Sequence, residues 1–174
     1  MALSLRLALG LTGDARRDQA KEALLVRLLA GRDVAALAPV AEAFADEVVA
    51  SHLRPDTRAR LEWHRDQGHE LVIVSASPEL YVVPLARRLG VDAVLATRLE
   101  VGADGRLSGR FAGRNCRGSE KPRRLREYLQ AGGAVVTLFA YGDSRGDREL
   151  LAMAQNAVWV GRRPLPHPGS TDAH

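Results

Sequence analysis

The feature that most constrains the fold is the uninterrupted apolar run Leu71-Val72-Ile73-Val74, followed by a helical pattern over residues 78–89. Four consecutive apolar residues of this kind are typical of a strand buried on both faces, as in parallel sheets. The alternation continues along the chain, with strands expected at 91–96, 135–141 and 157–160 and helices at 119–130 and 145–154. Strands that alternate with helices through right-handed crossovers predict an α/β fold with a parallel sheet.

The first part of the chain has a different pattern. Apolar residues recur at helical spacing over 14–31, 33–52 and the stretch from Pro55 to Gly68. We therefore expect a helical region at 1–67, an α/β core at 68–161 and a flexible tail at 162–174, where Pro, Gly, Ser and His accumulate. Within the core, the turn Ala103-Asp104-Gly105 predicts a hairpin between residues 98–101 and 106–111.

Composition excludes several classes of protein. With Cys116 as its single cysteine the chain forms no internal disulfide, which favours a reducing cytoplasm and an ordinary thiol. The apolar stretch Met1–Leu11 contains Arg6 and is too short to span a bilayer, so no membrane insertion is expected. The net charge of +4 is spread among 21 acidic residues, and aromatic residues make up only 5%, which argues against nucleic-acid binding.

Polar residues follow two of the expected strands. Ser75-Ala76-Ser77-Pro78 comes directly after the run at 71–74, where the Ser75 hydroxyl and the backbone N–H groups of a helix start could hold a phosphate. The alternative for Ser77 is a simple helix N-cap. In open α/β sheets, ligands bind beyond the carboxyl ends of the strands, so this is where chemistry is expected.

The second polar segment contains Asp143 and Asp147, after the strand at 135–141. Two carboxylates four residues apart on a helical turn could serve Mg²⁺, although helix capping would also explain them. Lys121 opens the helix at 119–130, where a cation opposes the helix dipole, so an anion in front of it would explain its place better than helix stability does. It is one of only two lysines among 25 basic residues, Lys21 being the other.

Together these segments resemble the second, third and fourth motifs of the haloacid dehalogenase superfamily. The similarity is greatest to the phosphoserine-phosphatase-like branch and rests on Val74–Pro78, Asn115–Lys121 and Tyr141–Ser144. The resemblance implies a Rossmann-like parallel sheet with an N-terminal helical cap. It also implies a Mg²⁺-dependent phosphomonoester hydrolase that acts through an aspartyl-phosphate on a small phosphorylated metabolite, with a phosphorylated lipid head group as another option.

The same resemblance implies roles for individual residues. Ser75 would hydrogen-bond the transferring phosphoryl group, with the backbone N–H of Ala76 as a helper. Lys121 would neutralise charge on the phosphoryl oxygens. Asp143 would ligate Mg²⁺, and Asp147 would be either a second ligand or a support for the first.

The sequence departs from the family pattern at one point. The family's first motif, Asp-x-Asp-x-Thr on a strand, supplies the nucleophile, and no such segment precedes Ser75. Asp14, Asp18 and Asp33 all stand in helical or capping context, so no nucleophile is assigned in this chain and the first central strand is expected to be missing between the strands at 71–74 and 135–141. A start site placed too far downstream, a shortened non-catalytic relative, and a partner chain that supplies the strand would each explain this.

The expectation is therefore a phosphatase by lineage that is inactive as written. The alternative is a non-catalytic protein of the same fold that retains phosphate and metal binding. The sequence leaves the oligomeric state open.

Overall fold

The computed structural model describes residues 13–133 and 136–165. The first half is helical, as predicted, with α2 (Gly13–Leu29), α3 (Val34–Glu47), a π-helical turn (Val48–His52) and α4 (Pro55–Asp66). The Asp33 carboxylate accepts hydrogen bonds from the backbone of Ala35 and Ala36 and so caps α3. The apolar stretch Met1–Leu11 lies outside the described residues.

Two parallel strand pairs form the α/β part. β1 (Val72–Pro78) pairs with β2 (Ala93–Thr97) and is connected to it through α5 (Glu79–Arg88). After α6 (Glu120–Gly132), β5 (Phe139–Gly142) pairs with β6 (Asn156–Trp159) through a 3₁₀ turn (Arg145–Asp147) and the short helix α7 (Arg148–Leu151). The parallel arrangement is confirmed. β1 is longer than predicted and continues to Pro78, whereas β5 begins at Phe139 instead of residue 135, a position outside the described ranges.

The two parallel pairs are not joined into one sheet. In the parts of the chain that the structure describes, β1 pairs only with β2 and β5 only with β6. Between β1 and β5 lies a mainly apolar cavity of about 650 Å³, whose lining includes Val72, Val74, Phe139 and Tyr141. This is the position at which the sequence predicts that a central strand is missing.

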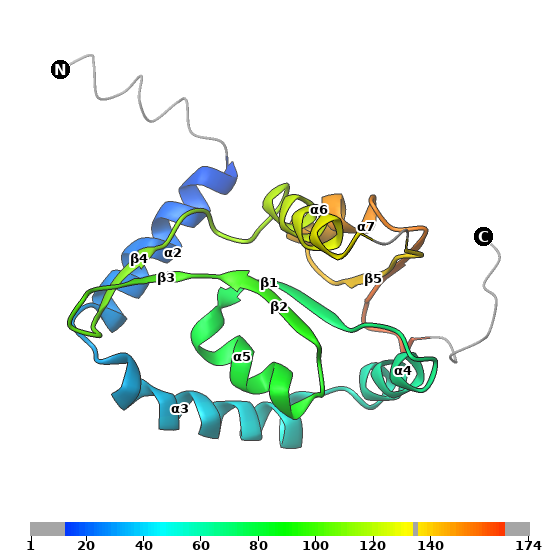
Figure 1. Ribbon diagram of the computed structural model, residues 1–174, viewed down its shortest axis with the longest axis horizontal. Coiled ribbons are helices and arrows are strands. Elements are labelled where there is room, and N and C mark those ends of the chain that lie inside the picture. Colours follow the sequence, from blue (N-terminus) through cyan, green and yellow to red (C-terminus); the bar gives the residue numbers. More distant parts are fainter. Residues whose placement is uncertain (1–12, 134–135, 166–174) are drawn as a thin grey trace, which may run out of the picture.

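The hairpin predicted at 98–111 is confirmed as β3 (Leu99–Val101) and β4 (Leu107–Phe111). Helix α2 runs along this hairpin (Figure 1). The approach is close at Gly109, which has a φ of 78°, because a Cβ atom there would lie 2.5 Å from the Cα of Val26. A glycine is therefore required where the helix crosses the strand.

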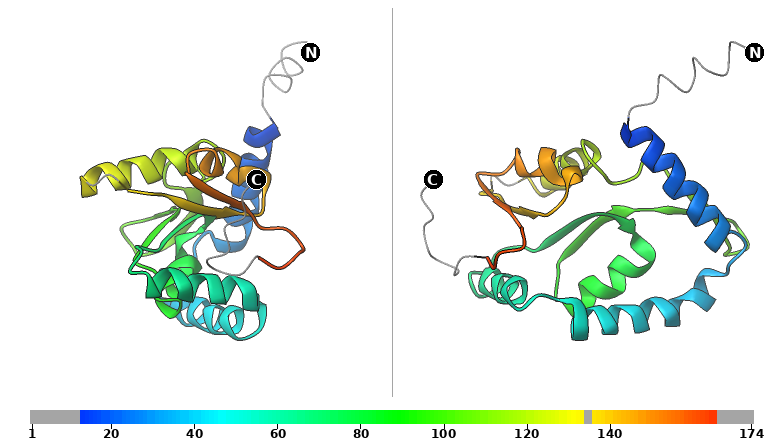
Figure 2. Two further views of the ribbon diagram at one scale, coloured as in Figure 1. Left: turned by 90° about the vertical axis from the view of Figure 1, so that its right-hand side faces the viewer. Right: turned by 180° about the vertical axis from the view of Figure 1, so that it is seen from behind.

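Helices cover β1 and β2 from two sides. α5 and, beyond it, α3 lie on one side, and α6 and α7 lie on the other (Figures 1 and 2). Arg88 of α5 forms ion pairs with Glu42 and Asp46 of α3, and the rings of Phe44 and Tyr81 meet edge to face at 5.3 Å. α3 is thus fixed to the core through α5.

The end of the described chain contacts α4. Arg54 donates a hydrogen bond to the carbonyl of Arg163, and the Leu165 N–H donates to Asp56. The flexible tail predicted from residue 162 otherwise falls outside the described residues, and the boundaries of the cap region and core remain predictions. Within the described ranges, no helix is both long enough and apolar enough to cross a bilayer.

Candidate active site

Lys121 connects the two parallel strand pairs. It lies in the first turn of α6, only 8% exposed, and its Nζ donates a 2.8 Å hydrogen bond to the carbonyl oxygen of Val74 in β1. The same ammonium forms a buried ion pair with Asp147, in the 3₁₀ turn after β5. The structure therefore brings Lys121 together with Asp147 and with the residue that precedes Ser75.

Ser75 is the last residue of β1 in regular register with β2 and is half-buried, and its side chain folds back on the chain. Its Oγ accepts a 3.1 Å hydrogen bond from the backbone N–H of Ser77. The predicted alternative role of Ser77 as an N-cap is wrong, because α5 begins after Pro78 and has no side-chain cap. The Oγ is only the acceptor in this hydrogen bond, so its own O–H remains able to donate to an anion.

Asp147 is held by three donors. Besides Lys121, both the backbone N–H and the hydroxyl of Ser144 donate to its Oδ2, at 2.9 and 2.6 Å. Burial raises the pKa of the Asp147 carboxyl, but the hydrogen bonds from Lys121 and Ser144 outweigh it and leave the pKa below its ordinary value. Gly142 makes room for this carboxylate, since a Cβ at that position would lie 2.5 Å from the Cβ of Asp147.

Asp143 stands apart from this buried group. It is exposed at the end of β5, and among the described residues no hydrogen bond or ion pair joins it to Asp147. The two carboxylates thus have different surroundings, because the 3₁₀ turn directs Asp147 inward to Lys121 whereas Asp143 is exposed. No group of three or more His, Cys, Asp or Glu side chains suited to a metal occurs in the described ranges.

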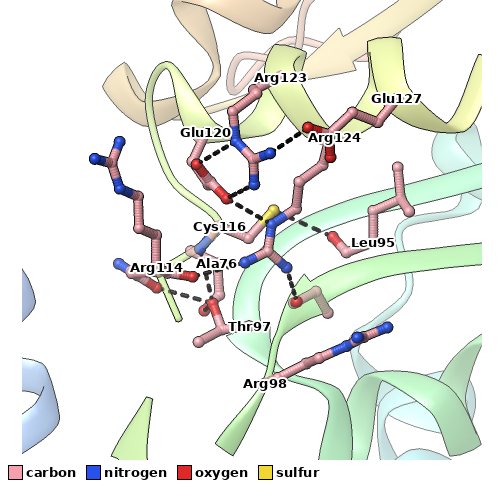
Figure 3. A network of polar contacts seen from close by, with 12 residues as sticks. Ala76, Leu95, Thr97, Arg98, Arg114, Cys116, Glu120, Arg123, Arg124 and Glu127 are labelled. Carbon is pink, nitrogen blue, oxygen red and sulfur yellow. Dashed lines mark hydrogen bonds and ion pairs between the residues drawn. The ribbon is translucent and has the colours of Figure 1, made fainter. Parts of the chain in front are cut away.

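A second ionic group fixes the start of α6, and sequence reasoning missed it. The buried Glu120 forms ion pairs with Arg123 and Arg124, one helical turn further on (Figure 3). These partners, foremost the hydrogen bond from Arg123, lower the pKa of Glu120 to about 2. Arg124 also donates to the carbonyl oxygens of Ala96, at 2.5 Å, and Arg114, at 2.7 Å. The i, i+3 and i, i+4 spacing in Glu-Lys-Pro-Arg-Arg was the available signal.

A third polar cluster surrounds the carbonyl of Ala76, next to Ser75. The fully buried hydroxyl of Thr97 lies 2.7 Å from this oxygen and 2.9 Å from Oδ1 of Asn115 (Thr97 and Ala76 are labelled in Figure 3). The Lys21 ammonium of α2 donates to both acceptors as well. The sequence marked Lys21 only as a rare lysine and gave no sign that it reaches β1.

Cys116, beside this cluster, is fully buried, and its Sγ contacts the carbonyl oxygen of Leu95 at 3.3 Å. Burial raises the pKa of the Cys116 thiol above its ordinary value. Such a thiol is a poor nucleophile, which agrees with the expectation that Cys116 is not part of a reaction.

Some known proteins similar to this chain carry phosphatase names. The haloacid dehalogenase-like hydrolase family matches residues 1–152. Protein CicA of Caulobacter vibrioides is 45% identical over 141 residues, 81% of this chain and 63% of that protein. Phosphoserine phosphatase SerB1 of Mycobacterium tuberculosis is 31% identical over 131 residues, 75% of this chain and 42% of that protein. The chain thus spans less than two thirds of the length of these relatives.

Two solved structures share the fold of this chain. A protein of unknown function from Bordetella pertussis superimposes with a TM-score of 0.68 at 31% identity, over 87% of this chain and 67% of that protein. A hydrolase of the same family from Salmonella enterica, 19% identical, shares the fold with a TM-score of 0.63 over 90% of this chain and 50% of that one. With the three motifs in order on β1, α6 and β5, the chain belongs to the haloacid dehalogenase-like hydrolase family, in its phosphoserine-phosphatase-like branch.

Proposed function

We propose that this chain carries the phosphate- and Mg²⁺-binding part of a phosphomonoester hydrolase. The observation that carries the proposal is the buried Lys121 ammonium, which contacts the backbone next to Ser75 on one side and Asp147 on the other. A buried lysine at a helix start is costly unless anionic groups face it. Asp147 supplies one such group, and a phosphate at the carboxyl ends of β1 and β5 would supply another.

Within this proposal Ser75 donates its hydroxyl to a phosphoryl oxygen, the Ala76 N–H assists it, and Lys121 offsets the negative charge. The backbone N–H of Ser77 is excluded as a phosphate ligand because it already donates to Ser75 Oγ. Lys121 retains a third donor beyond those directed at Val74 and Asp147, since an ammonium carries three. These groups hold the phosphate and stabilise charge on it.

The carboxylates fit a magnesium ion in different ways. Asp143 is exposed at the strand end, and among the described residues its carboxylate has no hydrogen-bond partner, which suits a cation that keeps several waters and takes few protein ligands. Asp147 is committed to Lys121 and Ser144, and this favours a supporting role over direct ligation. When bound, Mg²⁺ would neutralise charge on the phosphoryl oxygens.

The substrate we propose is a small phosphorylated metabolite. Among similar proteins, one from Mycobacterium tuberculosis is named a phosphoserine phosphatase, and one from Neisseria meningitidis, 28% identical over 121 residues, is named a histidinol-phosphatase. Both names describe phosphate monoesters of small amino-group-bearing molecules. We therefore propose that the shared site binds the phosphate and that the remainder of the substrate is recognised elsewhere.

Phosphate binding is the direct test. We expect titration calorimetry with inorganic phosphate and Mg²⁺ to show binding that Ser75→Ala weakens by about tenfold, the value of one hydrogen bond to a charged group. Ser51→Ala, which removes an exposed hydroxyl from the π-helical turn, is the matched control and should leave the affinity unchanged. Equal affinities for the two variants would reject the proposed site.

A non-catalytic role is the second candidate, favoured by the way the upstream aspartates are used. Asp33 caps α3, and Asp18 accepts a 2.6 Å hydrogen bond from Asn115. We expect this chain alone not to hydrolyse p-nitrophenyl phosphate with Mg²⁺. A version that carries the Asp-x-Asp-x-Thr strand ahead of Met1 should hydrolyse it if the lineage is catalytic. An extended protein that binds phosphate without turnover would favour the non-catalytic role.

A further inference from the structure

Helix α2 contributes a cation to the strand end that bears Ser75. Nζ of Lys21 lies 2.5 Å from the carbonyl oxygen of Ala76 and 2.8 Å from Oδ1 of Asn115. Lys121 contacts the carbonyl of Val74 from another element. The only two lysines of the chain therefore hold the two backbone carbonyls on either side of Ser75.

The Ala76 carbonyl belongs to the same peptide group as the Ser77 N–H. A trans peptide is planar, so the direction of its C=O fixes the direction of its N–H. Lys21 and Thr97 hold the oxygen end of this plane, and the nitrogen end donates to Ser75 Oγ. The position of the Lys21 ammonium is thus transmitted through one rigid peptide group to the hydroxyl of Ser75.

The remaining contacts keep Lys21 in place. Asp18, one turn earlier on α2, accepts from Nδ2 of Asn115 at 2.6 Å, so this amide is held by two residues of the same helix. Glu22 of α2 accepts from the backbone N–H of Phe111 at 2.8 Å, and the Lys21 ammonium lies 5.2 Å from the centre of the Phe111 ring. The helix therefore cannot shift along β4 without moving the ammonium.

Two of the three N–H donors of Lys21 end on neutral acceptors, and within the part of the chain that the structure describes Lys21 forms no ion pair. Its carboxylate neighbour Asp18 is turned to Asn115 instead. Thr97 could not replace Lys21, because its single proton can serve either Ala76 or Asn115 but not both. The Lys21 ammonium therefore supplies the donor that the Ala76 carbonyl and Asn115 Oδ1 would otherwise lack.

We propose that Lys21 is a positioning residue for Ser75, which orients the peptide group between Ala76 and Ser77 so that the Ser75 hydroxyl faces the phosphate. This inference rests on the proposed function, since it assumes that Ser75 binds phosphate. It also makes the docking of α2 on the hairpin a determinant of phosphate affinity.

The test compares Lys21→Met with Arg27→Met, which removes an equal charge from an exposed position on the same helix. With inorganic phosphate and Mg²⁺ as the probe, we expect Lys21→Met to bind roughly tenfold more weakly and Arg27→Met to bind like the original protein. In the absence of phosphate, the NMR amide-proton resonance of Ser77 should move upfield in Lys21→Met alone, since its hydrogen bond to Ser75 is lost. Lys21→Arg, which can still donate to Ala76, should restore both readouts.

The outcomes separate the two proposals. If Ser75→Ala weakens phosphate binding but Lys21→Met matches Arg27→Met, the inference is overturned and the proposed function stands. If the original protein does not bind phosphate, or Ser75→Ala binds it equally well, both are overturned. Should Lys21→Met fail to fold, Lys21→Gln, which is polar but too short to reach Ala76, takes its place in the same comparison.

Discussion

Two parts of β1 and β5 are held in opposite ways. Near Ser75, where the regular pairing of β1 with β2 ends, Lys121 spans from Val74 to Asp147 with buried, charged hydrogen bonds. In their amino-terminal parts the two strands are separated by an apolar cavity of about 650 Å³, and the apolar side chains of Val72 and Ile73 are only half-buried. The polar end is therefore held together by described side chains, whereas the apolar amino-terminal part is not filled by them.

This difference has a physical consequence. Removing one partner of a buried ion pair strongly destabilises the folded protein, because the other charge remains buried without compensation. Truncating an apolar side chain beside an existing cavity costs less stability than truncating one in a close-packed core, because fewer contacts are broken. Substitutions at the polar end should thus cost more than substitutions in the amino-terminal parts of the strands.

The largest effect is expected for Lys121→Met. The substitution leaves the Asp147 carboxylate buried without its cation and should lower the free energy of unfolding by about 3–5 kcal/mol. Urea denaturation measures the loss. Arg126→Met, on the exposed face of the same helix, is the control and should change stability by less than about 0.5 kcal/mol. A similar small loss for both variants would show that the ion pair does not join the strand ends.

Gly142→Ala should have the next largest effect. A methyl group at this position would meet the Cβ of Asp147 at 2.5 Å and push the carboxylate away from Lys121. We expect a loss of roughly 2 kcal/mol by urea denaturation and, if Asp147 supports the metal site, weaker Mg²⁺ binding by calorimetry. Gly132→Ala is a matched control, since nothing lies within 4 Å of a Cβ there. Normal stability in Gly142→Ala would mean that the strand end adapts.

The cavity between the amino-terminal parts of β1 and β5 offers a pH-dependent test. His64 of α4 lines the cavity, is buried and contacts His69 and Tyr141 at 2.8 and 2.9 Å. Burial, followed by the nearby His69 and Arg60, lowers its pKa from 6.5 to about 4. In the unfolded chain His64 binds a proton near pH 6.5, but the folded chain takes it up only near pH 4, so the free energy of unfolding falls as the pH drops through this window.

From pH 7 to pH 5.5, the protonation of His64 alone should lower the free energy of unfolding by about 1 kcal/mol. Urea denaturation at the two pH values measures the change, and His64→Gln, which does not titrate there, should flatten the dependence. The carboxyls of Glu120 and Asp56, with pKa values lowered to about 2, titrate well below this window. An unchanged slope in His64→Gln would assign the pH dependence to other groups.

Much of the strand-end geometry could be predicted because it follows from local order. An apolar run such as Leu71–Val74 specifies a buried strand, and residues after parallel strands gather at one edge of the sheet. The sequence thus predicts that Ser75 and Asp147 lie at one edge of the sheet, whereas the ion pair between Asp147 and Lys121, which opens a helix, was not predicted. The different fates of Asp143 and Asp147 could not be predicted, because a 3₁₀ turn replaces the expected helix start and directs only the second carboxylate inward.

The contacts of Lys21 lay beyond sequence reasoning for another reason. Its acceptor at Ala76 is 55 residues away and is a backbone carbonyl, which leaves no side-chain signature in the sequence. The same holds for Arg124, which binds the carbonyls of Ala96 and Arg114. Periodicity identifies the elements, but the packing of α2 against the hairpin decides which side chains reach the strand end.

The smallest expected effect compares two valines. Val82 of α5 is 3% exposed in the packed layer between α3 and the sheet, whereas Val72 of β1 borders the cavity and is half-buried. Val82→Ala should cost about 2 kcal/mol, from two lost methyl groups and the hole that they leave. Val72→Ala should cost less than about 1 kcal/mol, because one side of this residue already lacks neighbours. Equal losses by urea denaturation would mean that the cavity closes around Val72 in solution, and the contrast between the polar end and the amino-terminal parts of the strands would then not hold.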